Sequence, residues 1–182
     1  MKLEYRENNL ILKQLNESST NSVLDFYYRN KDYFDIYEAD KPDNFYTTGY
    51  IGNLLHAEYN AFAQKKFVRF FAYDQTFPDK IIGTVSFSDI KICPDASKTC
   101  IIGYKIDHNM QHQGYGYKML NAALKIMVTD WEMHRIEAYI SPNNLPSQRL
   151  VDKLGFISEG TAYSYVKLHG IWRDHLRYAY IS

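Results

Sequence analysis

The sequence contains little that ties the protein to an oxidising compartment or to a membrane. Its 182 residues include two cysteines, Cys93 and Cys100, and neither has the nearby Cys or His residues that a zinc site requires. They flank a short turn at Pro94–Ser97, so a disulfide is conceivable, but no other feature favours oxidation. The first residues lack the apolar core of a signal peptide, and no run approaches the roughly 18–20 apolar residues of a membrane span. We therefore expect a soluble cytoplasmic protein.

An excess of charge of one sign is also lacking. Lys plus Arg and Asp plus Glu each number 21, so the formal net charge is zero. Binding to nucleic acid or to an anionic membrane usually requires a basic excess. We expect neither as a partner, although local basic side chains could still bind a phosphorylated cofactor. The oligomeric state stays open between a monomer and a homodimer.

The chain also has no internal repeat and no low-complexity linker. Its length, with 46% hydrophobic residues, is enough for one domain with a sizeable core. We therefore expect a single domain over residues 1–182. The 17 tyrosines and ten phenylalanines are assigned mainly to this core and to the walls of a pocket.

Alternating and β-branched stretches predict seven strands. They are Asn9–Leu15, Val68–Tyr73, Ile81–Phe87, Ile101–Ile106, Arg135–Ile140, Ile157–Val166 and Trp172–Ile181. Apolar residues at steps of three and four predict the helices. The first helix follows Ser18–Asn21. The other predicted helices are a short one at Asn30–Tyr37, a long one at Tyr50–Phe67, one through Leu120–Trp131, and one at Leu145–Leu154 with a C-cap at Gly155. Strands joined by a helix usually run parallel, so we expect an α/β fold in which Ile101–Ile106 and Arg135–Ile140 form a parallel pair.

A glycine pair lies where the strand Ile101–Ile106 leads into a helix. The connecting loop reads Gln111-His112-Gln113-Gly114-Tyr115-Gly116. The first N–H groups of a helix have no partner within it, and the helix dipole is positive there, so a phosphate can bind. Gly114 and Gly116 carry no Cβ, which allows a ligand close to the backbone. On spacing alone, the alternative of a turn that only caps a helix stays open.

Two other phosphate-binding loops are excluded by their own spacing. The dinucleotide-binding pattern G-x-G-x-x-G requires a third glycine, where this chain has Met119. The P-loop requires Gly-Lys-Ser/Thr, which the residues Gly116-Tyr117-Lys118 do not supply. The remaining pattern is Q-x-x-G-x-G.

Three ordered blocks resemble the GNAT superfamily of N-acetyltransferases, in particular the RimJ/RimL type that acetylates N-termini of ribosomal proteins. The loop Gln111–Gly116 resembles the acetyl-CoA pyrophosphate loop. Asn144–Ser147 followed by Leu150–Phe156 resembles the N-x-x-S…K-L-G-F block, and Gly170–His175 resembles the final hairpin. The resemblance is specific over residues 81–181. It implies a mixed, mostly antiparallel sheet of about seven strands flanked by helices, in which the parallel pair splays apart around the pantetheine arm.

The resemblance also implies the residues that contact acetyl-CoA. They are Ile106, Gln111, His112, Gln113, Gly114, Tyr115, Gly116, Tyr117, Asn144 and Ser147. Asn144 and Ser147 are equally suited to begin a helix, and the two roles are compatible. Lys118 and His112 could add positive charge or could simply be solvated. No metal is expected.

The acid and the base of the reaction are less clearly marked. Ser147 could hydrogen-bond to or protonate the leaving thiolate, a modest demand because a thiol has a pKa of about 8.5. The tyrosine that the superfamily often places seven residues after the asparagine is Val151 here. Glu137 and Asp174 are candidate bases, although either could be an ordinary paired carboxylate.

Several further residues are weaker candidates. His134 and His175 are of the residue type that most often acts as a base near neutral pH, but they have no visible partner. Aromatic side chains on strands could line an acceptor cleft or could simply pack. These are Tyr104, Tyr163, Tyr165 and Trp172.

The sequence therefore predicts an acetyl-CoA-dependent N-acetyltransferase. A primary amine would attack the thioester directly in a ternary complex, while backbone amides near Tyr104–Ile106 polarise the carbonyl. The resemblance favours a protein N-terminal amine. A small amine, such as a polyamine, amino acid or antibiotic, stays open, because fold does not fix substrate. The alternative from another class is a module that binds acetyl-CoA without turnover.

Overall fold

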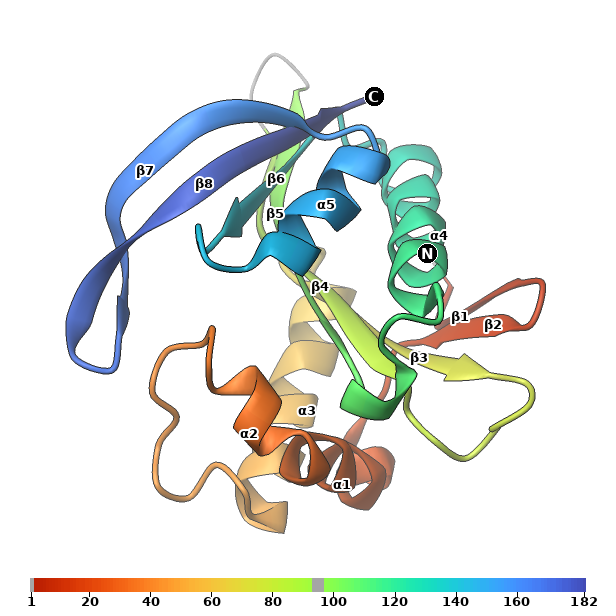
Figure 1. Ribbon diagram of the computed structural model, residues 1–182. Helices are drawn as coiled ribbons and strands as arrows, with labels where there is room; N and C mark the ends of the chain where they lie inside the picture. Colours follow the sequence, from red (N-terminus) through yellow and green to blue (C-terminus); the bar gives the residue numbers. More distant parts are fainter. Residues whose placement is uncertain (1, 93–96) are drawn as a thin grey trace.

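The computed structural model describes residues 2–92 and 97–182 of the chain (Figure 1). Cys93 and the turn at Pro94 lie outside the described residues, so the possible disulfide is not described, while Cys100 is buried. Within the described residues, every helix is too short or too polar to span a membrane.

Eight strands form one sheet in the order β1-β2-β3-β4-β5-β6-β8-β7. Their bounds are β1 Glu4–Glu7, β2 Leu10–Lys13, β3 Val68–Asp74, β4 Gly83–Ile92, β5 Lys98–Ile106, β6 Arg135–Ile140, β7 Ile157–Leu168 and β8 Ile171–Ile181. The helices are α1 Thr20–Arg29, α2 Lys31–Phe34, α3 Thr48–Ala63, α4 Tyr115–Thr129 and α5 Leu145–Lys153, with 3-10 turns η1 Glu17–Ser19 and η2 His108–Met110. Only β5 and β6 pair in parallel among the described strands.

The predicted α/β class and the mostly antiparallel sheet are confirmed, with one more strand than expected. The additional strand is β1, which pairs with β2 at the edge of the sheet. Its sequence, Glu4-Tyr5-Arg6-Glu7, has a single apolar residue, so hydrophobic pattern could not reveal it. The long helix α3 begins earlier than predicted because the Thr47 hydroxyl caps it, accepting the Tyr50 N–H at 3.2 Å.

The helices cover the two faces of the sheet. On β3, Phe71 and Tyr73 pack with α1 and α3, whereas Phe70 and Ala72 pack with α4. This follows from the alternation of side chains along a strand, and β3 is therefore buried on both faces. Figure 1 shows α4 and α5 on one side of the central strands and α1 to α3 on the other.

The parallel pair separates after a short ladder. Its register pairs are Thr99 with Arg135, Cys100 with Ile136, and Ile101 with Glu137. β5 continues to Ile106 and β6 to Ile140, but in the described structure those later residues do not pair with each other. The predicted splayed strand pair is thus confirmed, and it leaves an opening between the carboxyl halves of β5 and β6.

The helix α5, which follows β6, ends at a glycine as predicted. Gly155 has φ +86°, the left-handed conformation that glycine adopts readily. Its N–H donates to Asp152 O at 3.0 Å, and the Phe156 N–H donates to Val151 O at 3.1 Å. These two bonds close the end of a helix in the Schellman arrangement.

The hairpin of β7 and β8 extends away from the sheet as a long arm (Figure 1). Nearly all of β7 is exposed. At the tip of the arm, His169 Nδ1 lies 2.7 Å from Asp40 Oδ1, and His169 Nε2 lies 3.1 Å from Asp35 O. The arm therefore contacts the segment that follows α2.

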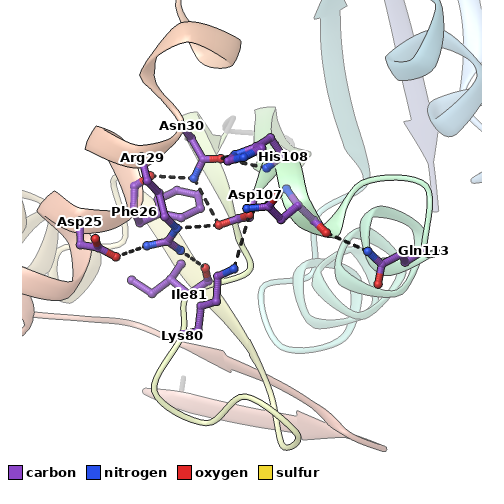
Figure 2. A network of polar contacts seen from close by, with 10 residues as sticks. Asp25, Phe26, Arg29, Asn30, Lys80, Ile81, Asp107, His108 and Gln113 are labelled. Atoms are coloured by element: carbon purple, nitrogen blue, oxygen red, sulfur yellow. Dashed lines mark hydrogen bonds and ion pairs between the residues drawn. The ribbon is translucent and has the colours of Figure 1, made fainter.

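A buried carboxylate, Asp107, fixes the chain where it leaves β5 (Figure 2). It is fully buried, and Arg29 Nε of α1 donates to its Oδ2 at 2.7 Å. The Asn109 N–H donates to Oδ1 at 3.0 Å, and Lys80 Nζ lies 3.8 Å from the same atom. Burial raises the pKa of Asp107, but the bonds from Arg29 and Asn109 outweigh it and hold the pKa below its usual range.

The same network reaches α2 and the next loop (Figure 2). Asn30 Oδ1 accepts the His108 N–H at 2.8 Å, and the His108 ring stacks on Tyr33 with centroids 4.6 Å apart. Gln113 Nε2 donates to Asn109 O at 2.8 Å. Polar contacts thus join α1 and α2 to the loop that precedes α4.

Arg29→Met should destabilise the protein strongly. Removing one partner of a buried ion pair costs about 3–5 kcal/mol, and we expect the lower end because the Arg29 side chain is 21% exposed. The free energy of unfolding is measured by urea titration at pH 7. The matched control is Arg6→Met, whose surface pair with Glu4 should contribute less than about 1 kcal/mol.

The pH dependence of this difference follows from the lowered pKa of Asp107. A carboxyl group with a lowered folded pKa stabilises the fold above its unfolded pKa, near 3.9, and loses that stabilisation as the pH falls through the folded value. The difference between wild type and Arg29→Met should therefore narrow as the pH falls toward and below about 4. A difference independent of pH would contradict this account.

Candidate active site

The helix α4 begins as the glycine pair predicted. Gly114 is the N-cap residue, with φ +81°. The first bond of the helix runs from the Lys118 N–H to Gly114 O at 3.1 Å. The N–H groups of Tyr115, Gly116 and Tyr117 precede that bond, so they have no partner within the helix. A helix of 15 residues therefore presents its positive end at this loop.

A cleft of about 760 Å³ lies in the opening between β5 and β6. One side is formed by β5 from Ile102 to Ile106, by the loop at the start of α4, and by α5. The other side includes the end of β6 and side chains between residues 33 and 38. The cleft therefore runs from the face covered by α4 and α5 to the face covered by α1 to α3.

Most of the predicted cofactor residues line this cleft. They are Ile106, Gln111, His112, Gly114, Gly116, Tyr117, Asn144 and Ser147. The side chains of Gln113 and Tyr115 do not: Gln113 bonds to Asn109 O, and Tyr115 lines a separate hollow with Lys118 and Asp74. Any contact from Gln113 and Tyr115 to a ligand in the cleft would therefore be made by the backbone.

Gly116 occupies a position with little room. A Cβ added there would lie 3.2 Å from Leu150 Cδ2 and 3.6 Å from Ile106 Cγ1. Both of these residues also line the cleft. The absent side chain therefore leaves the backbone of the first helical turn accessible from the cleft, as a phosphate-bearing ligand requires.

Two basic residues of α5, which sequence reasoning missed, line the cleft as well. They are Arg149 and Lys153, and Lys153 Nζ lies 4.8 Å from the centre of the Tyr117 ring. Their spacing of four residues places them on one side of a helix. Together with the α4 N-terminus they make this end of the cleft positive, which suits a phosphorylated molecule.

Ser147, at the start of α5, lines the cleft and contacts β5. Asn144 is the N-cap of α5, and its Oδ1 accepts the Ser147 N–H at 3.2 Å. Ser147 Oγ lies 2.5 Å from the hydroxyl oxygen of Tyr104 on β5. Burial raises the pKa of Tyr104 to about 12, so the phenol is neutral at physiological pH. Both residues line the cleft.

The two candidate bases are engaged elsewhere. Glu137 accepts hydrogen bonds from Arg135 Nε and Tyr139 Oη, both at 2.7 Å. Burial raises the pKa of Glu137, but these two bonds outweigh it and lower the pKa. Asp174 accepts the Ser164 N–H at 2.8 Å on the hairpin arm. Neither carboxylate is among the described residues that line the cleft.

Tyr139 and His175 stand on the other side of the opening and line it. Tyr139 stacks on Tyr165 with ring centroids 4.1 Å apart. Of the aromatic residues predicted to line an acceptor cleft, Tyr104 does line the cleft. Tyr165 contacts the cleft residue Tyr139, and Tyr163 is 80% exposed. Trp172 is likewise exposed. The alternation along β6, which places Tyr139 on the face of Glu137, could have revealed Tyr139 from sequence.

The charges beside the opening are balanced. Glu38 lines the cleft, but it forms ion pairs with Lys41 Nζ at 2.9 Å and Lys105 Nζ at 2.5 Å. This side of the cleft is therefore not strongly acidic. The described residues also contain no group of three or more His, Cys, Asp or Glu side chains able to hold a metal ion.

An opened parallel strand pair, lined by a helix N-terminus, basic side chains and a hydroxyl pair, suits a transferase that uses a phosphorylated co-substrate. Residues 9–157 match the acetyltransferase (GNAT) domain family, so the chain belongs to that family. It is a GNAT N-acetyltransferase, and its relatives and structural neighbours include N-acetyltransferases of the RimJ/RimL type.

Individual relatives agree with this assignment. The probable N-acetyltransferase YjcK of Bacillus subtilis is 33% identical over 150 residues, covering 80% of this chain and 79% of YjcK. The [ribosomal protein uS5]-alanine N-acetyltransferase of Escherichia coli is 27% identical over 176 residues, covering 96% and 89%. The crystal structure of the ribosomal-protein-S5-alanine acetyltransferase from Vibrio fischeri superposes with a TM-score of 0.91 at 25% identity, covering 99% and 97%.

Gly116→Val should weaken the binding of coenzyme A at least about tenfold, or 1.4 kcal/mol. The branched side chain would stand between Ile106 and Leu150 and obstruct the first turn of α4. Isothermal titration with coenzyme A measures the effect. In the matched control, Gly49→Val, the new Cβ meets nothing within 4 Å, while the change in helix propensity is similar. Equal affinity in the two variants would show that Gly116 does not border the ligand.

Proposed function

We propose that this protein transfers the acetyl group of acetyl-CoA to the N-terminal amine of a protein by direct attack. The observation that carries the proposal is the cleft between β5 and β6, which joins the free N–H groups of α4 to the Ser147 hydroxyl. Acetyl-CoA supplies the activated acetyl group as a thioester. An acceptor reaching the same opening from the other face of the sheet would meet it there.

The chain offers groups suited to each end of acetyl-CoA. The N–H groups of residues 115–117 and the side chains of Arg149 and Lys153 would hold the phosphates. Beyond Ile101, the edge of β5 that faces β6 has no partner strand among the described residues. Backbone N–H groups on that edge can therefore bind the arm of the co-substrate and polarise the thioester carbonyl.

The transfer forms a bond from nitrogen to the acetyl carbon and breaks the bond from that carbon to sulfur. Ser147 donates a hydrogen bond to the departing sulfur, which becomes a thiolate and takes up a proton from solvent. Because a thiol has a pKa of about 8.5, this leaving group needs only modest assistance. The protein contributes chiefly by holding the two reactants close together.

Proton removal from the acceptor does not require a strong base. A protein α-amine has a pKa of about 7.7–8, so an appreciable fraction is neutral near pH 7. Glu137 and Asp174 remain the predicted bases, and each would have to act through an intervening water because neither lines the cleft. His175 lines the cleft directly and is 5% exposed. We therefore add it as a third candidate.

A peptide acceptor fits the charges and shape of the opening better than a polyamine does. A polyamine site requires an excess of acidic groups, whereas Glu38 is neutralised by Lys41 and Lys105. Exposed apolar side chains instead flank the entrance, including Tyr33 and Ile36. They suit the first side chains of an extended peptide. The uS5-alanine specificity of the Escherichia coli relative supports the same class and a cytoplasmic reaction.

Ser147→Ala should lower kcat by roughly tenfold or more, because the departing sulfur loses its hydrogen-bond donor. The affinity for acetyl-CoA should change little, since the phosphates are held elsewhere in the cleft. Thiol release measures turnover, and isothermal titration measures binding. Ser158→Ala, on the exposed part of β7, is the control. Unchanged turnover in Ser147→Ala would remove Ser147 from the reaction.

The acceptor class is tested by thiol release with three substrates. One is a peptide that begins with alanine, the second is the same peptide with a blocked N-terminus and an internal lysine, and the third is spermidine. We expect turnover with the first alone. Faster turnover with spermidine would make the protein a small-amine acetyltransferase, and turnover with the blocked peptide would make it a lysine acetyltransferase.

A further inference from the structure

The hydroxyl group of Tyr104 lies within hydrogen-bond distance of the Ser147 hydroxyl. The two oxygens are 2.5 Å apart, although the residues are 43 positions apart in the sequence. Tyr104 lies on the part of β5 that has separated from β6. Its side chain therefore reaches across the opening to the first turn of α5.

We propose that Tyr104 is a positioning residue that donates its hydrogen bond to Ser147 Oγ and thereby directs the Ser147 O–H toward the departing sulfur. This inference rests on the proposed function, in which Ser147 assists the leaving group. Tyr104 itself does not touch the reacting atoms in this arrangement.

The Tyr104 phenol can donate this hydrogen bond at neutral pH. Burial raises the pKa of Tyr104 to about 12, although the bond to Ser147 acts in the opposite direction. The phenol therefore keeps its proton at neutral pH and can donate it in a hydrogen bond. Ser147 also offers its carbonyl oxygen, but at 3.4 Å that contact is much longer. The hydroxyl of Ser147 is the better acceptor.

Without Tyr104, Ser147 would have another orientation available. Serine hydroxyls in helices readily turn back to bond a carbonyl of the preceding turn. The backbone of Ser147 is already fixed, because its N–H donates to Asn144 Oδ1. When Ser147 Oγ accepts a hydrogen bond from the Tyr104 hydroxyl, the serine hydroxyl stays on the cleft side. The proton of the Ser147 hydroxyl then remains available for donation. Chains of hydrogen bonds also strengthen one another, so Ser147 becomes a better donor.

A double-mutant cycle tests the proposal. Tyr104→Phe keeps the ring and removes only the hydroxyl, and we expect kcat to fall roughly tenfold, as for the loss of one hydrogen bond. The KM for acetyl-CoA should be nearly unchanged. In the Ser147→Ala background, Tyr104→Phe should have no further effect. Tyr73→Phe, at a buried tyrosine on β3, is the matched control and should leave kcat unchanged.

Two kinetic results would overturn the proposal. Equal losses from Tyr104→Phe with and without Ser147 would mean that the two hydroxyls act independently. A larger loss from Tyr104→Phe than from Ser147→Ala would make Tyr104 itself the donor to sulfur. Either result leaves the acetyl transfer intact, whereas absence of thiol release by the wild type would contradict the proposed function instead.

A readout that does not depend on turnover completes the test. Crystal structures of the wild type and of Tyr104→Phe, each with coenzyme A, would show the side-chain rotamer of Ser147. We expect the wild-type hydroxyl to face the cleft and the variant hydroxyl to turn toward the backbone carbonyl of Asn143 or Asn144, which directly precede α5. An identical rotamer in both structures would refute the positioning role, whatever the activity.

Discussion

The architecture of this enzyme depends on the short parallel ladder between β5 and β6. Pairing ends at Ile101, and from there the two strands separate. The cleft lies in that gap, α4 points its N-terminus toward it, and α5 begins beside it. A longer ladder would have closed the sheet and left no passage between its two faces. The cleft is therefore made by ending a regular interaction early, rather than by adding an element to the fold.

A second constraint holds the loop that precedes α4. Asp107 closes β5 and is fully buried, so its charge requires partners, and Arg29 on α1 is the principal one. Asn30 extends the contact to His108, whose ring stacks on Tyr33 at the acceptor side. One set of polar contacts thus fixes both the loop that precedes α4 and the segment around Tyr33.

The sequence predicted those parts of the fold that local patterns encode. The β-branched run Ile101–Ile106, the glycine pair before α4, and Asn144 at the start of α5 each depend on neighbouring residues, and the structure has them as expected. The bond between Tyr104 and Ser147 joins segments 43 residues apart, so no local pattern could reveal it. The acceptor-side residues around Tyr33 carry no motif and enter the site only through folding. The hydrogen bonds of Glu137 are different, because its partners Arg135 and Tyr139 lie two residues before and after it on β6. A local pattern does encode these contacts.

The open edge of β5 also affects the energetics of the whole molecule. A sheet edge normally obtains its hydrogen bonds from another strand, and here solvent or a ligand must supply them. In the proposed function the co-substrate would supply these bonds, and a ligand that binds only the folded chain stabilises it. At a concentration of 100 times its Kd, such a ligand adds about 2.7 kcal/mol to the free energy of unfolding. That is a large share of the roughly 5–15 kcal/mol typical of a domain, so in a cell the lifetime of this protein would follow the supply of its own acetyl donor.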